Sequence, residues 1–327
     1  MRWRSGDARV EREAPGIESP FPRFRPWPSA SGGTLPHQPC LLLWEKPAIQ
    51  ILWEKPTIIL RIAVPVPLPG LFDYLPPVEG GASSAPVPAP GMRVQVPFGT
   101  RVRVGMIVAL GEDSDQPPER LKPILALIDD RPLLGNRDLE LILWAADYYR
   151  QPPGEALFAA LPARLRRPEP ALDALHGQVT PGGGDGGQVS GEGTSQALAP
   201  GPELNPRQEE AVRAVLGALG RFQPFLLEGV TGSGKTEVYI RLLLAVLAAG
   251  GQALLLVPEI GLTPQLRRRL GGRLPGRLVI LHSGLTAKER ELAWQAAASG
   301  AADLVLGTRS AVFTPLPRLQ LILVDEE

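Results

Sequence analysis

The segment GVTGSGKT at residues 229–236 constrains the fold of this chain more than any other feature. It is a complete P-loop pattern, and it lies between an apolar stretch at 225–228 and a helical pattern at 235–249. Its glycines let backbone N–H groups surround phosphate oxygens, and the helix that follows adds the positive end of its dipole. The sequence therefore predicts a nucleotide site in an α/β domain.

The P-loop and a second motif supply the candidate catalytic residues. We expect Lys235 to reach the β- and γ-phosphates and the Thr236 hydroxyl to bind Mg²⁺. The apolar stretch 321–324 is followed by Asp325 and Glu326, which is typical of a Walker-B motif. Asp325 would hold Mg²⁺, and Glu326 would polarise the attacking water. The predicted ATP-binding residues are Gln208, Gly229, Thr231, Gly232, Ser233, Gly234, Lys235 and Thr236.

Gln208 lies upstream of the P-loop and allows two interpretations. Its amide presents both a donor and an acceptor, so it can bind an adenine edge. It can equally be an exposed residue of a helix. The residues alone do not favour either interpretation.

Residues 204–327 alternate between helical and strand patterns. Continuous apolar strands between helices are typical of a parallel sheet that is covered on both faces. We predict helices at 206–219, 235–249, 263–270 and 286–298, and strands at 225–228, 253–257, 278–281, 304–306 and 321–324.

Residues 59–128 show the two-residue alternation of half-buried strands, most clearly at 93–98 and 101–110. Short strands with Gly and Pro turns favour a small β-barrel, and 121–128 is a further candidate strand. Helices are expected at 136–150 and 154–161. Asn136 is the predicted N-cap of the first helix, and Tyr149 is expected on its apolar face.

Two segments do not have the pattern of a folded domain. Glycine and proline make up 73 of the 327 residues, which is just short of the share that indicates a low-complexity chain. Residues 168–203 are expected to be a linker, because they contain too little apolar surface to offset their ordering entropy. Residues 1–58 are expected to be a disordered extension. The alternatives are a docking peptide that uses Trp44 and Trp53, or a start of translation assigned too far upstream.

Composition excludes several classes of protein. One cysteine rules out a disulfide framework and a cysteine-based zinc site within these residues. No apolar run approaches the roughly 18 residues of a membrane span, and the N-terminus has no apolar signal region. Net charge is zero, with 34 Lys and Arg against 34 Asp and Glu, which does not exclude nucleic acid because binding follows local patches. A cytoplasmic protein is expected.

Several stretches together resemble the PriA family of bacterial primosomal replication restart helicases (primosomal protein N′). P-loops are generic, but the combination with the segment PEIGLTPQ at 258–265 is highly specific. The resemblance runs from about residue 59 to the last residue, apart from the linker. The stretches that carry it are 64–69, 72–74, 93–99, 143–149, 229–239, 257–265, 281–285 and 307–313.

The resemblance implies an ATP-dependent DNA helicase that moves three-prime to five-prime and acts in replication restart and primosome assembly at stalled forks. It implies an N-terminal DNA-binding barrel at 59–167 and an incomplete first RecA-like lobe at 204–327. The cofactors would be ATP and Mg²⁺. The partners would be forked and single-stranded DNA, primosomal proteins and single-strand-binding proteins. The expected location is the cytoplasm, in association with the nucleoid and with no membrane.

In this family the barrel captures the three-prime end of the nascent leading strand, and the matching positions are Phe72, Asp73, Gly99 and Lys122. Phe72 can stack on a base, Asp73 can accept from a terminal hydroxyl, and Lys122 can meet a phosphate. Gly99 lets the backbone come close. At a strand end of the motor lobe, Arg309 and Ser310 suit phosphates of a nucleic-acid strand.

The chain departs from the family pattern in three ways. Residues 168–203 are too short for the family's winged-helix domain, and residues 1–58 match nothing in the family. The chain also stops before the second motor lobe, which would supply an arginine finger and the zinc-binding cysteines. We therefore expect a fragment or shortened homologue that does not unwind DNA. The alternatives are a DNA-end binding module without ATP turnover, and an unrelated P-loop ATPase or kinase.

Overall fold

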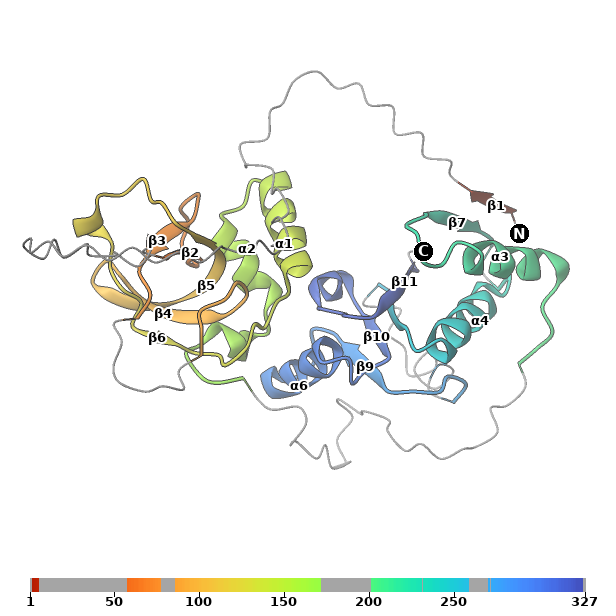
Figure 1. The fold of residues 1–327 in the computed structure, drawn as a ribbon. Coiled ribbons are helices and arrows are strands. Elements are labelled where there is room, and N and C mark those ends of the chain that lie inside the picture. The colour runs from red at the N-terminus through yellow and green to blue at the C-terminus, as the bar shows by residue number, and fades with distance from the viewer. Residues whose placement is uncertain are drawn as a thin grey trace, which may run out of the picture. The chain divides into compact units, whose positions relative to one another are not determined.

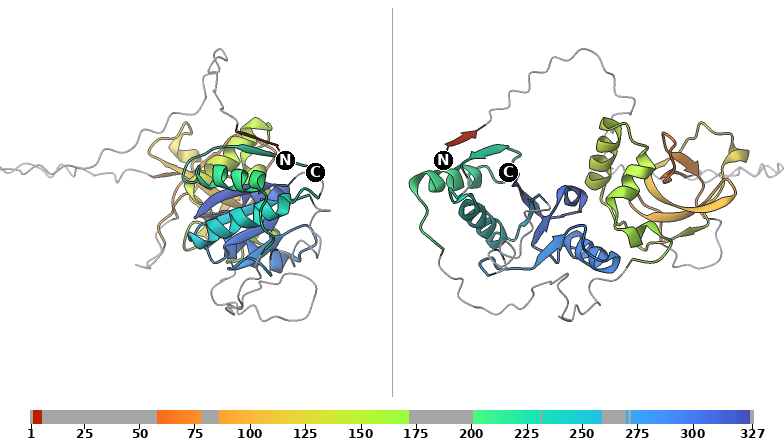
Figure 2. Two further views of the ribbon diagram at one scale, coloured as in Figure 1. Left: turned by 90° about the vertical axis from the view of Figure 1, so that its right-hand side faces the viewer. Right: turned by 180° about the vertical axis from the view of Figure 1, so that it is seen from behind.

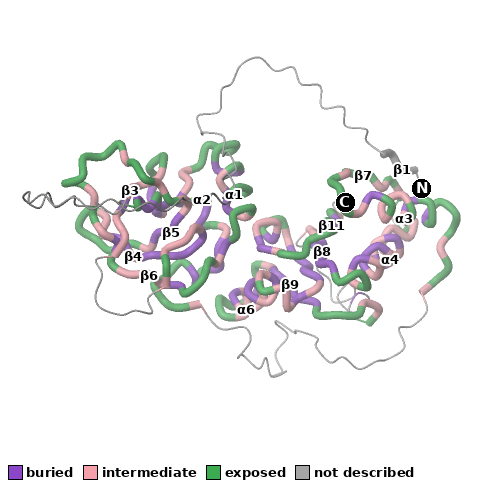
Figure 3. Tube along the Cα trace, in the orientation of Figure 1, coloured by how far each residue is buried: buried purple, intermediate pink, exposed green. Residues whose placement is uncertain are grey.

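The computed structural model contains an antiparallel barrel in the N-terminal half of the chain and a parallel sheet in the C-terminal half (Figure 1). Each is covered by helices and has its own buried core (Figure 3). The predicted fold class, a small β-barrel followed by a P-loop domain with a parallel sheet, is confirmed. The structure describes residues 2–5, 58–77, 86–171, 201–230, 232–258, 270 and 272–325.

Among the described residues, five antiparallel strands form the barrel, in the order β3-β2-β5-β4-β6. The two ends of this sheet meet, because the Leu75 N–H donates to the Lys122 oxygen at 2.9 Å and the Ile124 N–H donates to the Leu75 oxygen at 3.0 Å. Closure removes the exposed sheet edges. The strands are β2 (Ile59–Ala63), β3 (Phe72–Tyr74), β4 (Arg93–Phe98), β5 (Arg101–Gly111) and β6 (Ala126–Leu127).

Alternation along the strands places one set of side chains in the barrel core. In β2, Leu60 and Ile62 are buried, whereas Arg61 between them is exposed. In β4, Val94 and Val96 point into the same core. This is the pattern that the sequence predicted for 93–98, and it fixes the register of the strands.

The expected strand at 121–128 is wrong in length. Only Ala126–Leu127 pair with β4, and a short 3-10 helix, η1 (Pro118–Arg120), precedes them. Pro123 has no N–H to donate to a ladder, so it forms only an isolated bridge with Leu75.

Helices α1 (Asn136–Tyr148) and α2 (Pro153–Ala160) and the 3-10 helix η2 (Ala163–Arg166) follow the barrel. Two details of the predicted first helix are wrong. Its N-cap is Gly135, whose N–H donates to the Asp138 carboxylate at 3.0 Å, and not Asn136. Tyr149 is 67% exposed, because it follows the last helical residue and turns away from the buried face.

The parallel sheet has the strand order β11-β8-β10-β9. Its faces alternate: Leu255 and Leu306 pack toward α3 and α4, and Leu254 and Val305 pack toward α6 and η4. Helices cover both faces, as predicted. The strands are β8 (Gln252–Leu256), β9 (Leu278–Leu281), β10 (Leu304–Gly307) and β11 (Leu319–Val324), and the helices are α3 (Pro206–Leu216), α4 (Lys235–Ala248), α6 (Ala287–Ala298) and η4 (Arg309–Phe313).

Strand β7 (Phe225–Glu228) was expected to be part of this parallel sheet, but it does not join it. It pairs antiparallel with β1 (Arg2–Ser5), in a register that joins Arg2 to Glu228 and Ser5 to Phe225 (Figure 2). Strand β7 is only half-buried, as its alternate residues are exposed. The two paired segments lie more than 200 residues apart in the chain, so no local sequence pattern predicts the pairing.

Several predictions fall wholly or largely outside the described residues. These are the disordered extension apart from residues 2–5, most of the linker, and the helix at 263–270 apart from Leu270. No helix in the described part of the chain is long and apolar enough to cross a membrane.

Candidate nucleotide and DNA-binding sites

The loop between β7 and α4 has a backbone shape that favours glycine. Gly232 and Gly234 have φ angles of 80° and 84°, a region that side chains with a Cβ rarely adopt. Gly234 is the N-cap of α4, so the helix begins with Lys235 and Thr236. The two residues that the sequence assigns to phosphate and Mg²⁺ therefore lie in the first helical turn, where unpaired N–H groups and the helix dipole favour anions.

Ser233 gives a test of whether this loop fits a phosphate. Its hydroxyl oxygen is buried and has no hydrogen-bond partner among the described residues. An unsatisfied buried hydroxyl is unfavourable unless a ligand supplies the partner. A Cβ added at Gly232 would meet open space. The loop therefore fits the polyphosphate of a nucleotide, while Thr231 lies outside the described residues.

Gln208 contacts the P-loop directly. Its Nε2 donates to the Ser233 oxygen at 3.2 Å, and its Oε1 accepts from the Asn205 N–H at 2.9 Å. The second bond is half of a capping box, because the Asn205 side chain accepts from the Gln208 N–H. Both polar groups of this amide thus bind the protein in the structure. Recognition of adenine by Gln208 stays a prediction.

Asp325 lies beside the same helix. Its N–H donates to the Leu256 oxygen at 2.8 Å, which holds it at the end of the parallel sheet. Its Oδ1 accepts from the Tyr239 hydroxyl at 3.2 Å. Tyr239 stands four residues after Lys235 on α4, so it lies on the same helix face. The sequence alone assigns Tyr239 no role, and only its spacing from Lys235 could have indicated one. Glu326 lies outside the described residues.

A charged pair stabilises the first turn of α4. The Arg273 guanidinium binds both carboxylate oxygens of Glu237, with 2.8 Å between Nη2 and Oε1. Hydrogen bonding to Arg273 is the main reason that the pKa of Glu237 lies below its ordinary value. The carboxylate is therefore held ionised at a helix N-terminus, which is a favourable place for negative charge.

The predicted DNA contacts Arg309 and Ser310 are exposed residues of η4, directly after β10. The end of the parallel neighbour β9 lies beside them, because the Thr308 N–H donates to the Leu281 oxygen at 3.2 Å. His282 has a structural contact, since its Nδ1 accepts from the Gly284 N–H at 3.1 Å. The specific segment at 259–265 lies outside the described residues.

In the barrel, the structure brings Phe72 next to the turn that contains Gly99. The rings of Phe72 and Phe98 meet edge to face with centroids 5.0 Å apart. Gly99 has a φ of 59°, and a Cβ there would meet nothing within 4 Å. Phe72 is half-buried and also packs against the barrel core, so only part of its ring is exposed. Lys122 is exposed, and its backbone closes the barrel beside β3.

Asp73 lies between two side chains that point into the barrel. Phe72 and Tyr74 pack on the core, and Tyr74 donates its hydroxyl to the Pro97 oxygen at 3.0 Å. Burial raises the pKa of the Tyr74 hydroxyl. The Asp73 carboxylate instead accepts from the Ser114 hydroxyl at 2.6 Å. Ser114 was not predicted from the sequence, because it lies 41 residues away from Asp73 along the chain.

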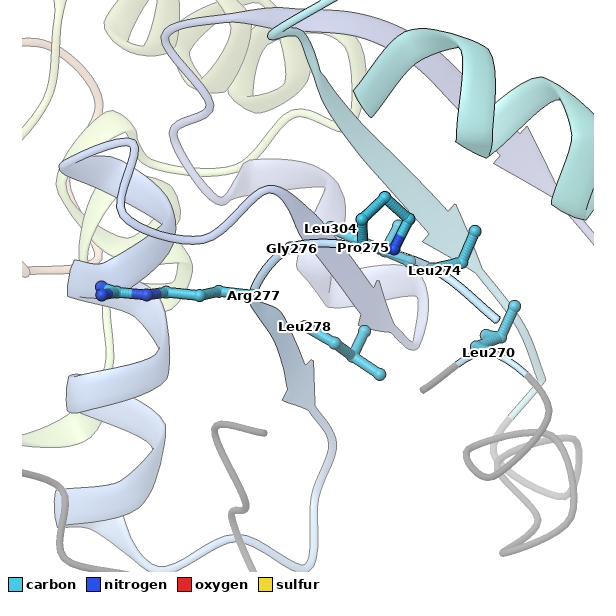
Figure 4. Close-up of a pocket in the computed structure, with 7 residues that line it drawn as sticks. All are labelled: Leu270, Leu274, Pro275, Gly276, Arg277, Leu278 and Leu304. Carbon is cyan, nitrogen blue, oxygen red and sulfur yellow. The ribbon is translucent and has the colours of Figure 1, made fainter. Parts of the chain in front are cut away.

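The structure also contains a small cavity beside β9 (Figure 4). Its walls are mostly apolar, and the Arg277 side chain extends away from the leucines. None of the predicted site residues lines it, so we assign it no function. The lining residues are Leu270, Leu274, Pro275, Gly276, Arg277, Leu278 and Leu304.

Comparison with known proteins identifies both halves of the chain. The family model described as 3'DNA-binding domain (3'BD) matches residues 61–162, and that of the DEAD/DEAH box helicase family matches residues 205–327. The replication restart protein PriA of Haemophilus influenzae is 35% identical over 82% of this chain and 44% of its own length. PriA of Treponema pallidum is 33% identical over 82% of this chain and 38% of its own length.

A third relative covers less of the chain at higher identity. PriA of Synechocystis is 50% identical over 38% of this chain and 15% of its own length. The chain spans less than half the length of the curated relatives that it matches. Its two matched regions and the relatives that align across most of it agree: the chain belongs to the PriA family of replication restart proteins and corresponds to their N-terminal portion.

Proposed function

We propose that this chain reads DNA three-prime ends with its barrel and binds ATP and Mg²⁺ with its P-loop domain. It would serve as part of an ATP-dependent, three-prime to five-prime DNA helicase for replication restart at stalled forks. The observation that carries the nucleotide site is the set of hydrogen bonds around the P-loop. Gln208 binds the loop at Ser233, and Tyr239 of α4 binds Asp325 at the sheet end.

Different residues of the chain would have different roles at the nucleotide site. Gly229, Gly232 and Gly234 shape the loop, and Lys235 and the Ser233 hydroxyl would bind phosphate oxygens. Bound Mg²⁺ would neutralise phosphate charge, held by the Thr236 hydroxyl and the Asp325 carboxylate. Tyr239 orients that carboxylate through Oδ1. Thr231 and Glu326 would complete the set, as loop residue and water-orienting base.

The barrel supplies the DNA-end site. Phe72 would stack on the terminal base, Asp73 would accept from the terminal hydroxyl, and Lys122 would pair with a phosphate. Gly99 leaves open space for a close approach. Forked and single-stranded DNA are the proposed substrates, and Arg309 and Ser310 would contact the strand at the motor lobe. Primosomal and single-strand-binding proteins are the partners that this role requires.

Lys235→Ala is expected to weaken ATP binding about 10- to 100-fold, because one charge-assisted contact to phosphate is lost. Titration of the 327-residue chain with a fluorescent ATP analogue measures the change. Lys288→Ala is the matched control, since Lys288 is an exposed lysine of α6 in the same domain. An unchanged affinity in the Lys235 variant would show that the nucleotide site is placed wrongly.

The chain is expected to bind DNA with a three-prime hydroxyl about tenfold more tightly than the same DNA with a three-prime phosphate, because the phosphate cannot donate to Asp73 and adds charge beside it. Asp73→Ala should abolish this preference. Fluorescence anisotropy with the two labelled DNAs measures both affinities. Asp115→Ala, which removes an exposed carboxylate near Ser114, should leave the preference in place. Equal binding of both ends by the unmodified chain would refute the pocket.

A further inference from the structure

The hydrogen bond between Ser114 and Asp73 joins a loop to a strand of the barrel. Ser114 lies in the loop after β5, and Asp73 is the central residue of β3. The distance of 2.6 Å between Ser114 Oγ and Asp73 Oδ2 falls in the range of hydroxyl-to-carboxylate bonds, which are stronger than neutral ones. The contact is therefore able to hold the carboxylate in one orientation.

A second bond directs the serine proton. The Gln116 N–H donates to Ser114 Oγ at 3.1 Å. A serine hydroxyl has one proton and two lone pairs, and this bond occupies a lone pair. The proton is then free to point toward Oδ2 of Asp73. The loop backbone, through Gln116, thus sets the direction in which Ser114 donates.

The other carboxylate oxygen of Asp73 is left for a ligand. Asp73 pairs across the strands with Arg61, which is exposed, while its neighbours Phe72 and Tyr74 pack on the core. Within the described part of the chain, Oδ1 of Asp73 accepts no hydrogen bond. An ionised carboxylate only accepts hydrogen bonds, so its ligand must donate one.

We infer that Ser114 is a positioning residue for three-prime-end recognition, which holds Oδ2 of Asp73 so that Oδ1 faces the terminal hydroxyl of a DNA strand. The inference rests on the proposed DNA-end function of the barrel. A terminal hydroxyl can donate to Oδ1, whereas a three-prime deoxy end cannot. Ser114 fixes the rotamer of Asp73 in advance, and less freedom is lost when the end binds.

The test compares a three-prime hydroxyl, a three-prime deoxy end and a three-prime phosphate on one labelled DNA. Ser114→Ala is expected to lower the preference for hydroxyl over deoxy by about three- to tenfold, the effect of one hydrogen bond. Affinity for the deoxy end should not change, whereas loss of structure would weaken all three ends together. Ser114→Thr, which keeps the hydroxyl, should retain the preference. Ser299→Ala is the control for removal of a hydroxyl elsewhere.

Asp73→Ala separates this inference from the proposed function. If Ser114→Ala alone lowers the preference, Asp73→Ala loses it and the double variant behaves as Asp73→Ala does, the two residues act as one unit. If Asp73→Ala loses the preference but Ser114→Ala keeps it in full, the positioning role is wrong and the pocket stands. If Asp73→Ala keeps the preference, the proposed end site itself is wrong, and Ser114 has no role in it.

Discussion

Replacing Arg93 with methionine is expected to destabilise the barrel by about 3–5 kcal/mol. Arg93 is fully buried in β4, and its guanidinium pairs with the Asp129 carboxylate at 2.6 Å. It also donates to the main-chain oxygens of Leu165, Arg167 and Glu169. Methionine approximates the length of the arginine stem, but it leaves a buried carboxylate without a counter-charge and three oxygens without this donor.

Hydrogen exchange of the 327-residue chain, followed by mass spectrometry, measures the loss of stability segment by segment. Peptides from β4 and β5 should exchange faster as the free energy of opening falls. Arg150→Met is the matched control: it breaks a pair with Asp147 in which the side chains are 84% and 65% exposed. That change should alter stability by less than about 1 kcal/mol. Equal exchange of β4 in the two variants would show that the Arg93 pair does not stabilise the barrel.

Gly91→Ala is expected to destabilise the barrel by about 2–6 kcal/mol, because backbone strain and collision add. Gly91 has a φ of 88°, and a Cβ there would lie 2.0 Å from the Leu134 oxygen. Its N–H donates to the Ile107 oxygen and its own oxygen accepts from the Leu133 N–H. The segment therefore cannot move aside without breaking these bonds.

Two other glycines separate the contributions to this effect. Gly70→Ala measures the effect of backbone strain alone, since Gly70 has a φ of 96° and a Cβ there would meet nothing within 4 Å. Gly154→Ala measures the effect of the collision alone. Gly154 has an ordinary backbone conformation, and a Cβ there would lie 1.8 Å from the Val64 oxygen. Hydrogen exchange of β4 should be least affected in the Gly70 variant. A Gly91 variant as well protected as the Gly70 variant would contradict the expected collision.

The P-loop domain was predictable because its signals are local. The pattern at 229–236, the apolar strands and the carboxylate after the last strand each fit within a few residues. The strand order and the pairing of β7 with β1 were not predictable, since they join segments far apart in the chain. The helix cap at Gly135 was missed because a side chain three residues later supplies the capping bond.

The candidate sites show the same difference between local signals, which the sequence reveals, and contacts between distant residues, which it does not. Lys235, Thr236 and Asp325 followed from motifs, and Phe72 and Asp73 followed from resemblance. Tyr239 is 86 residues from its partner Asp325, and Ser114 is 41 from Asp73. A hydroxyl that orients a distant carboxylate leaves no periodic pattern. Only the folded chain brings such pairs together.

The bonds of Arg93 have a mechanical consequence. Three carbonyls spread over five residues, from Leu165 to Glu169, are bound by one guanidinium. A pulling force on the chain beyond Glu169 would reach the bond at the Glu169 oxygen first, and then those at Arg167 and Leu165. The load would pass through the guanidinium to Asp129 and to the start of β4, where Arg93 is the first residue. Tension on this part of the chain would then act on the buried pair of Arg93 and Asp129 before it reached the bonds between the strands.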